Sequence, residues 1–334
     1  MANSRQMLAL LKSHVRGDDQ EFLSVAMEMA ASEARKGHTK VAQTLKDLID
    51  QARKQPVQSG PRPVLVLPNK SELSSLLFTT ESNTRLSDMV LPEALASRLT
   101  RILLEYRQQA RLRAHGLRPR RKILLIGPPG SGKTMTAAAL AGELHLPFST
   151  ILLEGIITKF MGETAAKLKL VFDAISASEG VYLFDEFDAL GAKRTQSNDV
   201  GEIRRVLNTF LQLLEKDDSN SLIIAATNHP ELLDRALFRR FDDVLEYGLP
   251  DGEMIRRIIT SRLATFAGKD IDWKVVVEKV RGLSQADVSR AAEDAVKHAL
   301  LQEQSHVTTS SLLSALDERT SSSRSLELSE TTHA

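Results

Sequence analysis

A short glycine-rich run has the residue types best suited to chemistry in this sequence. Residues 127–134 read GPPGSGKT, which fits the spacing G-x-x-x-x-G-K-[ST], and they stand between the apolar run 123–126 and the alanine-rich run 137–141. Glycines let a loop curl so that consecutive backbone N–H groups point inward at a phosphate, and a helix that begins there adds partial positive charge. A glycine-rich turn without a ligand is the alternative, but the order of strand, loop and helix favours nucleotide binding.

The ligands expected at this loop are ATP and Mg²⁺. Lys133 is expected to reach the β- and γ-phosphates, and the Thr134 hydroxyl is expected to bind Mg²⁺. The residues predicted to bind ATP here are Gly127, Pro128, Pro129, Gly130, Ser131, Gly132, Lys133, Thr134 and Met135.

Two acidic residues follow another apolar run, 181–184, which reads VYLF. Asp185 is expected to complete the nucleotide and Mg²⁺ site with Thr134, while Glu186 polarises the attacking water. An Asp-Glu pair after an apolar run is a weak signal by itself. It gains weight here because it lies on the next-but-one strand after the phosphate loop.

Further polar residues complete the candidate site. Asn228 follows the apolar run 222–226 and Thr227, and its amide can orient the attacking water, although a turn-forming asparagine is the alternative. Arg239 and Arg240 stand just before another expected strand. Paired arginines at such a place are either surface charge or a source of guanidinium for the γ-phosphate.

The elements that must position these residues alternate between strand and helix. This alternation predicts an α/β fold with a P-loop and a doubly wound parallel sheet. The candidate strands are 123–126, 148–153, 181–184, 222–226 and 244–247. Pro250 closes the sheet, and a helical pattern follows it.

The chain is predicted to divide into several parts. Apolar spacing indicates a small N-terminal helical domain at 1–55, and prolines indicate a linker at 56–87. The α/β domain occupies 88–250, and a C-terminal helical lid subdomain occupies 251–318. The Ser/Thr/Glu-rich tail, 319–334, is predicted to be disordered.

The composition is that of a globular protein with an ample core: 334 residues, 42% hydrophobic and 26% charged, with a net charge of +1. No apolar run reaches the roughly 18 residues of a membrane span, and the first residues lack the apolar core of a signal peptide. Cysteine is absent, which excludes disulfides and thiolate metal sites. A cytoplasmic location without a membrane partner is the default expectation.

A basic segment at 107–122 joins the expected helix 93–115 to the first strand of the α/β alternation. Its cations are Arg107, Arg111, Arg113, Arg118, Arg120, Arg121 and Lys122. Such a segment can bind nucleic acid. Charge runs are more often solvated helix ends, so a nucleic-acid partner is not expected.

Four motifs taken together resemble the AAA family of P-loop ATPases. They are GPPGSGKT, YLFDEFDAL, AATN and ALFRRFD, and the resemblance extends over 88–317. It implies an α/β ATPase domain with a helical lid that assembles as a homo-oligomeric ring, usually a hexamer. It also assigns the acids 185–186 to the second ATP-site motif, Asn228 to the sensor position and the arginines 239–240 to the finger positions.

Other stretches extend the resemblance. Residues 88–91 are similar to the segment that flanks adenine, and 282–287 are similar to the start of a lid helix. ALFRRFD lacks the Pro-Gly of the commoner form and is closer to the single-ring members that remodel or sever protein assemblies. Which arginine acts as the main finger is left open by this departure.

One further stretch indicates what the ring acts on. Lys159, Phe160, Met161 and Gly162 resemble the family's pore loop, which faces the ring axis. An exposed phenylalanine followed closely by glycine is unusual for a helix, and an aromatic that grips an extended protein chain explains it. The alternative is that Phe160 packs locally.

The predicted function is a ring ATPase that remodels or unfolds protein substrates by threading them past residues 159–162. The bundle at 1–55 is expected to recruit a substrate, an adaptor or a separate protease, and the chain itself lacks the H-E-x-x-H motif of a metalloprotease. One rival is a nucleic-acid motor or loader that uses 107–122. Another is a nucleotide-switched scaffold with slow hydrolysis, against which Glu186 and the paired arginines argue.

Overall fold

The computed structural model divides into two units, Met1–Val66 and Leu67–Ala334. It describes the single residues 27 and 43 and the ranges 73–156, 161–190, 199–233, 235–268 and 271–331. Apart from those two single residues, the helical domain predicted at 1–55 lies outside the described residues and stays a prediction. The elements below all belong to the second unit.

The second unit is built on a six-stranded sheet with the order β1-β3-β4-β5-β2-β6. All neighbouring strands are parallel except for β1, which runs antiparallel to β3 at one edge. The strands are β1 (Leu77–Glu81), β2 (Lys122–Ile126), β3 (Pro147–Ile151), β4 (Val181–Phe184), β5 (Leu222–Thr227) and β6 (Asp243–Glu246). Every strand predicted from the sequence is present, and the predicted α/β fold is confirmed.

Residues 73–87 are structured, which corrects the part of the predicted linker that the structure describes. β1 pairs with β3, Phe78 lies opposite Thr150, and a 3₁₀ helix, η1, follows at Leu86–Asp88. Sequence reasoning missed β1 because most of its side chains are exposed and show no apolar alternation. Its hydrogen bonds to the edge of β3 hold it in place.

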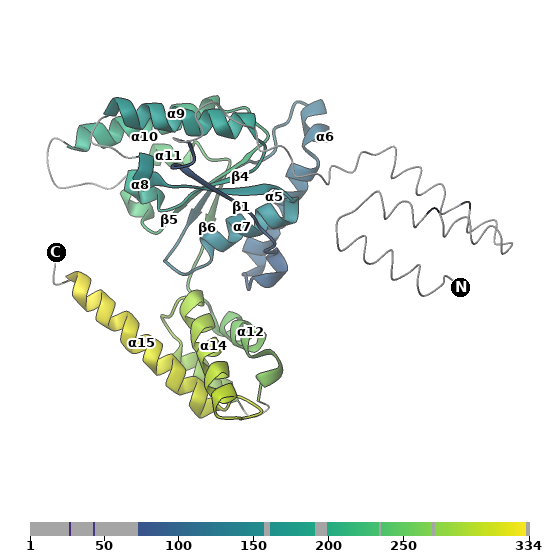
Figure 1. Ribbon diagram of the computed structural model, residues 1–334, viewed down its shortest axis with the longest axis vertical. Coiled ribbons are helices and arrows are strands. Elements are labelled where there is room, and N and C mark those ends of the chain that lie inside the picture. The colour runs from purple at the N-terminus through teal and green to yellow at the C-terminus, as the bar shows by residue number, and fades with distance from the viewer. Residues whose placement is uncertain are drawn as a thin grey trace. The chain divides into compact units, whose positions relative to one another are not determined.

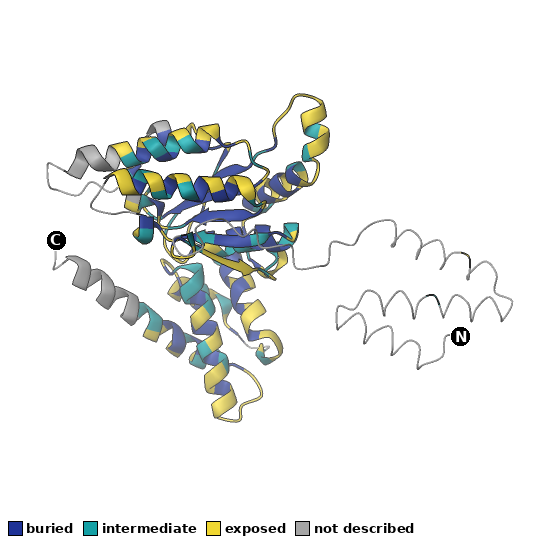
Figure 2. Ribbon diagram, turned by 45° about the horizontal axis from the view of Figure 1, so that its top comes forward, coloured by how far each residue is buried: buried dark blue, intermediate teal, exposed yellow. Residues whose placement is uncertain are grey.

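Helices cover both faces of the sheet, as a doubly wound fold requires (Figure 1). α5 and α7 contribute to the core on one face, and α8, α9 and α10 contribute to the core on the other. Figure 2 shows the strands other than β1 as a largely buried layer, with the outer sides of the helices exposed. The helices around the sheet are α5 (Glu93–Arg107), α6 (Gln109–Ala114), α7 (Lys133–Leu144), α8 (Leu153–Ile156), α9 (Met161–Ala177), η2 (Phe187–Leu190), α10 (Asp199–Lys216), η3 (Pro230–Leu232) and α11 (Arg235–Phe238).

The single helix predicted at 93–115 is divided in two. α5 ends at Arg107, Gln108 leaves helical geometry with φ −103° and ψ 18°, and α6 follows. The residues of α5 that are buried against the sheet are Leu95, Leu99, Ile102, Leu103 and Tyr106.

The lid is a helical subdomain with an apolar core of its own. It comprises α12 (Gly252–Leu263), η4 (Ala264–Phe266), α13 (Trp273–Lys279), α14 (Gln285–Leu301) and α15 (Thr309–Thr331). Side chains cap three of these helices: Asp251 accepts a hydrogen bond from Met254 N at 2.8 Å, Asp272 accepts one from Lys274 N at 3.1 Å, and Ser284 accepts one from Asp287 N at 3.2 Å. No helix in the described part of the chain is long and apolar enough to cross a membrane.

Helix α15 spans Thr309–Thr331 and so runs into the tail, 319–334, for which the sequence predicts disorder; the disorder of the tail stays a prediction. No glycine or proline interrupts the range 309–331. Arg319 also forms an ion pair with Asp294 of α14 at 2.5 Å. This contact comes from a residue far away in the sequence, so the Ser/Thr/Glu-rich composition of the tail could not indicate it.

Candidate nucleotide-binding site

The predicted polar residues meet at the carboxyl ends of three adjacent strands. The phosphate loop follows β2, the acids 185–186 follow β4, and Asn228 follows β5. The parallel register brings these ends close together: Ile126 lies opposite Thr227, and Phe184, the last residue of β4, lies opposite Ala225, two residues before the end of β5. This edge is where open α/β sheets bind their ligands.

All three N–H groups of the Lys133 ammonium donate hydrogen bonds. Its ammonium group donates to the backbone oxygens of Gly127 at 2.7 Å and Pro128 at 2.9 Å, and to Asn228 Oδ1 at 2.7 Å. Burial lowers the pKa of Lys133, while nearby carboxylates, Asp185 first among them, act in the opposite direction. The phosphate-loop lysine and the predicted water-orienting amide are therefore in direct contact.

Thr134 and Asp185 are also in contact, as the predicted Mg²⁺ site requires. Thr134 Oγ1 donates to Asp185 Oδ2 at 2.7 Å, and Asp185 Oδ1 accepts a hydrogen bond from Glu186 N at 3.0 Å. Thr134 is exposed and Asp185 is half-buried, so solvent reaches both. A hydroxyl and a carboxylate are hard oxygen donors, the class that Mg²⁺ prefers, so these two residues fit the ion.

Glu186 is an exposed residue with a strained backbone. Its φ of 50° lies in the left-handed region, which residues other than glycine rarely adopt. The residues after it are fixed: Phe187 is fully buried with its ring 4.8 Å from that of Phe210, and Asp188 accepts a hydrogen bond from the Thr227 hydroxyl at 2.9 Å. Strain that the surrounding packing imposes in this way is typical of functional sites.

Two glycines of the loop are packed too closely for any larger residue. A Cβ on Gly127, where φ is +146°, would lie 2.2 Å from the backbone oxygen of Tyr247. A Cβ on Gly130, where φ is +69°, would lie 2.5 Å from Ser284 Oγ, and Ala286 N donates to Gly130 O at 3.0 Å. The loop is thus held between the residue after β6 and the start of α14 in the lid.

Ser131 carries an unusual buried hydroxyl. Its Oγ has no hydrogen-bond partner, the one such buried side-chain atom within the described ranges. Buried polar groups in native proteins are almost always bonded, so an orphaned hydroxyl inside a glycine-rich loop fits a ligand with acceptor oxygens. Nucleotide phosphates are ligands of that kind.

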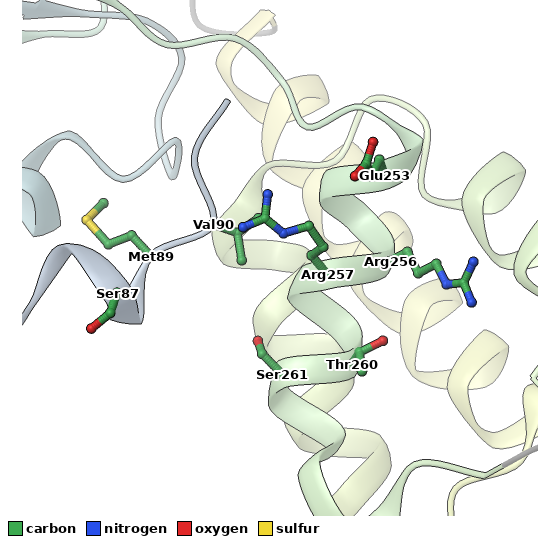
Figure 3. A pocket seen from close by; sticks show the side chains of 8 residues that line it. All are labelled: Ser87, Met89, Val90, Glu253, Arg256, Arg257, Thr260 and Ser261. Atoms are coloured by element: carbon green, nitrogen blue, oxygen red, sulfur yellow. The ribbon is translucent and has the colours of Figure 1, made fainter. Parts of the chain in front are cut away.

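An open cavity of about 660 Å³ lies between residues 87–90 and helix α12 (Figure 3). Met89 lines one side, and Arg257 and Ser261 line the other. Its volume is within the range of small-molecule sites. The 87–90 segment also reaches the phosphate loop, since Met89 Cε lies 3.4 Å from where a Cβ on Gly132 would stand.

The two candidate finger arginines lie between α11 and β6 and are exposed. Arg240 forms an ion pair with Glu215 of α10, whereas Arg239 has no ion pair among the described residues. Neither side chain is hydrogen-bonded to the phosphate loop or to the acids 185–186 within that part of the chain.

Half of the predicted pore loop, 159–162, falls outside the described residues. Lys159 and Phe160 are not described, and α9 begins at Met161. Gly162 is exposed, and no atom lies within 4 Å of where its Cβ would stand. The pore-loop assignment stays a prediction.

Known protein families match the part of the chain that carries these motifs. Residues 123–249, which hold the phosphate loop, both acids, Asn228 and both arginines, match the ATPase family associated with various cellular activities (AAA). The chain is also 32% identical over 308 residues to an uncharacterized AAA family ATPase, y4kL, of Sinorhizobium fredii, with 92% of each chain covered. The chain belongs to the AAA family of ATPases. It is therefore a nucleotide-binding ATPase.

Other AAA proteins match a smaller share of this chain. The proteasome-activating nucleotidase of Pyrococcus abyssi is 36% identical over 226 residues, which are 65% of this chain and 57% of that protein. That of Methanothermobacter thermautotrophicus is 35% identical over 211 residues, which are 60% and 51% of the two chains. The chain thus spans little more than half the length of these relatives. The crystal structure of the FIGL-1 AAA domain superposes with a TM-score of 0.60 at 21% identity, over 81% of this chain and 98% of that one, which supports the fold.

Sequence reasoning missed the residues that hold the AAA site in place. Asp188 and Thr227 join the turn after β4 to the end of β5, and Ser284 supports Gly130 from the lid. A serine three residues before an aspartate at the start of a helix is typical of an N-cap, so the position of Ser284 at the start of α14 could have been predicted from the sequence. The contact between Asp188 and Thr227 joins residues far apart in the chain, and no pattern of neighbouring residues predicts it.

Proposed function

We propose that this AAA ATPase hydrolyses ATP in a hexameric, homo-oligomeric ring and uses the reaction to remodel or unfold protein substrates. The observation that carries the proposal is the contact of Lys133 with Asn228 and of Thr134 with Asp185 at the strand ends. The relatives named proteasome-activating nucleotidases support a protein substrate and a protease as partner.

ATP is the substrate of the proposed reaction. The oxygen of a water molecule attacks the γ-phosphorus, the bond to the β–γ bridging oxygen breaks, and the bond's electron pair stays with ADP. Glu186 accepts the proton that the water loses, and the Asn228 amide orients the water. Lys133 offsets negative charge on the phosphates.

Thr134 and Asp185 are the residues that would hold Mg²⁺. When bound, the ion neutralises charge on the β- and γ-phosphate oxygens. The cavity beside Met89 is the proposed place of the adenine, because it adjoins the phosphate loop and is bounded by both the α/β domain and the lid.

Arg239 is the proposed main finger for the ATP site of a neighbouring subunit. It is exposed and has no ion pair among the described residues, whereas Arg240 is engaged with Glu215 of its own chain. An exposed ion pair of this kind is weak, so Arg240 can still contribute. We expect Arg239→Ala to lower ATP turnover more than Arg240→Ala does.

The remaining parts of the proposal rest mainly on residues that the structure does not describe. Residues 159–162 would form the pore loop that grips the substrate chain. The helical domain at 1–55 would recruit the substrate, an adaptor or a separate protease. A cytoplasmic location goes with these roles.

A nucleic-acid motor is the alternative function, and the ion pairs of the basic segment count against it. Arg120 contacts Glu105 and Asp243 at 3.0 Å each, and Arg121 pairs with Asp217 in the interior. The other cations of the segment with acidic partners are Arg107 and Arg118. Cations that are already paired with carboxylates add little to phosphate binding, which depends on unneutralised charge.

A substrate-trapping experiment tests the proposed function. Glu186→Gln rings, loaded with ATP, are incubated with a permanently unfolded protein such as casein, and bound casein is measured after size exclusion. Lys133→Ala is the matched control, because it lacks the charge that holds ATP. We expect casein to stay with the Glu186→Gln ring only in the presence of ATP, and to stimulate turnover by the unmodified protein. Stimulation by nucleic acid instead of casein would favour the motor.

A further inference from the structure

A buried hydrogen bond outside the predicted ATP site links the phosphate loop to the strand that leads into the lid. The hydroxyl of Tyr247, the residue after β6, donates to Thr136 Oγ1 at 2.7 Å. Thr136 lies in the first turn of α7, and its own hydroxyl donates to the Gly132 backbone oxygen at 3.0 Å. Tyr247 is 3% exposed and Thr136 is fully buried.

The backbone of Tyr247 contacts the opposite end of the same loop. Tyr247 N donates to Ile126 O at 2.8 Å, which continues the pairing of β6 with β2. Gly127, the first residue of the loop, packs against the Tyr247 backbone oxygen. Tyr247 therefore fixes the start of the loop through its main chain and the end of the loop through its side chain.

The same residue stands at the entrance to the lid. Only residues 248–250 separate Tyr247 from Asp251, which caps α12. The surrounding cluster is apolar and includes Leu140 and Leu245. An apolar pair would fill the space of Tyr247 and Thr136 without the cost of burying two hydroxyls, so the distinct contribution of this pair is the direction that its hydrogen bonds impose.

We propose that Tyr247 is a positioning residue for the phosphate loop, whose hydroxyl orients the Gly132 carbonyl and the first turn of α7 and thereby sets the affinity for nucleotide. The inference rests on the proposed binding of ATP at this loop. Burial raises the pKa of Tyr247 to about 12, so its hydroxyl keeps its proton at neutral pH and can donate the hydrogen bond.

Removal of one oxygen atom tests the proposal. Tyr247→Phe is expected to raise the dissociation constants for ATP and ADP about 3- to 10-fold, the effect of one net hydrogen bond. The constants are measured by displacement of a fluorescent ADP analogue at 20 °C. Circular dichroism at the same temperature confirms that each variant is folded, so a loss of stability alone does not change the result.

Substitutions at the other end of the bond give a second test. Thr136→Ser keeps the hydroxyl and is expected to bind nucleotide within about twofold of the unmodified protein. Thr136→Val leaves the Tyr247 hydroxyl buried without an acceptor, so its affinity should fall further than that of Tyr247→Phe. The double variant Tyr247→Phe/Thr136→Val should bind better than Thr136→Val alone, because no donor is then left unpaired.

Tyr182→Phe is the matched control. Tyr182 is a buried tyrosine of β4 whose hydroxyl donates to Ser178 O at 2.8 Å, on the other face of the sheet. Tyr182→Phe is expected to leave the affinity for nucleotide unchanged. An affinity of Tyr247→Phe within about twofold of the unmodified protein, or an equal loss in Tyr182→Phe, overturns the inference. If the unmodified protein binds ATP without turning it over, the proposed hydrolysis fails while the affinity test still decides the role of Tyr247.

Discussion

Arg121→Ala is expected to destabilise the second unit strongly and to leave nucleic-acid binding unchanged. The Arg121 guanidinium donates to both the carboxylate and the backbone oxygen of Asp217, and the two side chains are only 9% and 1% exposed. Removing one partner of such a pair leaves a buried charge uncompensated, which costs about 3–5 kcal/mol. At about 2–4 °C for each kcal/mol in a domain of this size, the melting temperature should fall by roughly 6–20 °C.

Two further variants separate the buried pair from ordinary surface charge. Arg118 pairs with Asp218 at 3.2 Å, but these side chains are 80% and 74% exposed. Arg118→Ala should therefore change stability by no more than about 0.5 kcal/mol. Arg121→Met combined with Asp217→Leu removes both buried charges and should recover much of the stability lost in Arg121→Ala.

The assays are a thermal melt of each variant and fluorescence anisotropy with single-stranded and duplex DNA at physiological salt. A melting temperature for Arg121→Ala no lower than that of Arg118→Ala would refute the assignment of the basic segment to internal ion pairs. Tight DNA binding that Arg118→Ala weakens, together with stimulation of ATP turnover by DNA, would establish the motor function instead.

The other predictions concern the ATP cycle and the pore. Lys133→Ala should abolish ATP binding, while Glu186→Gln should bind ATP and lose at least about 100-fold in turnover; near-normal steady-state turnover in the second variant would exclude Glu186 as the base. Subunits with Arg239→Ala and Arg240→Ala, mixed with Lys133→Ala subunits, should recover some ATP turnover if the fingers act across the interface, and no recovery in confirmed mixed rings would contradict this. Phe160→Ala should keep normal melting and basal turnover but lose the unfolding of a substrate. Local packing of Phe160 would instead cost about 3–5 kcal/mol of stability, which a thermal melt detects.

The sequence by itself determined the parallel strands of the α/β part, the helical character of the lid and which residue types do the chemistry. The apolar runs of the parallel strands, the spacing of GPPGSGKT and the acids after 181–184 are patterns of residues close together in the chain. Such patterns can be recognised from the sequence without knowledge of the fold. Parallel strands also end at one edge of their sheet, so the meeting of the phosphate loop, Asp185 and Asn228 followed from the predicted order of elements.

Only the tertiary structure decided the features that depend on residues far apart in the chain. Strand β1 exists because β3 offers it an edge, and α15 extends past residue 319, where Arg319 contacts Asp294. The basic segment carries the composition of a nucleic-acid site, yet partners such as Asp217 and Asp243 neutralise much of it. The Tyr247–Thr136 bond joins residues separated by 111 positions. A hydrogen bond or an ion pair needs two groups within a few ångströms, and chain folding, which no local pattern encodes, brings them together.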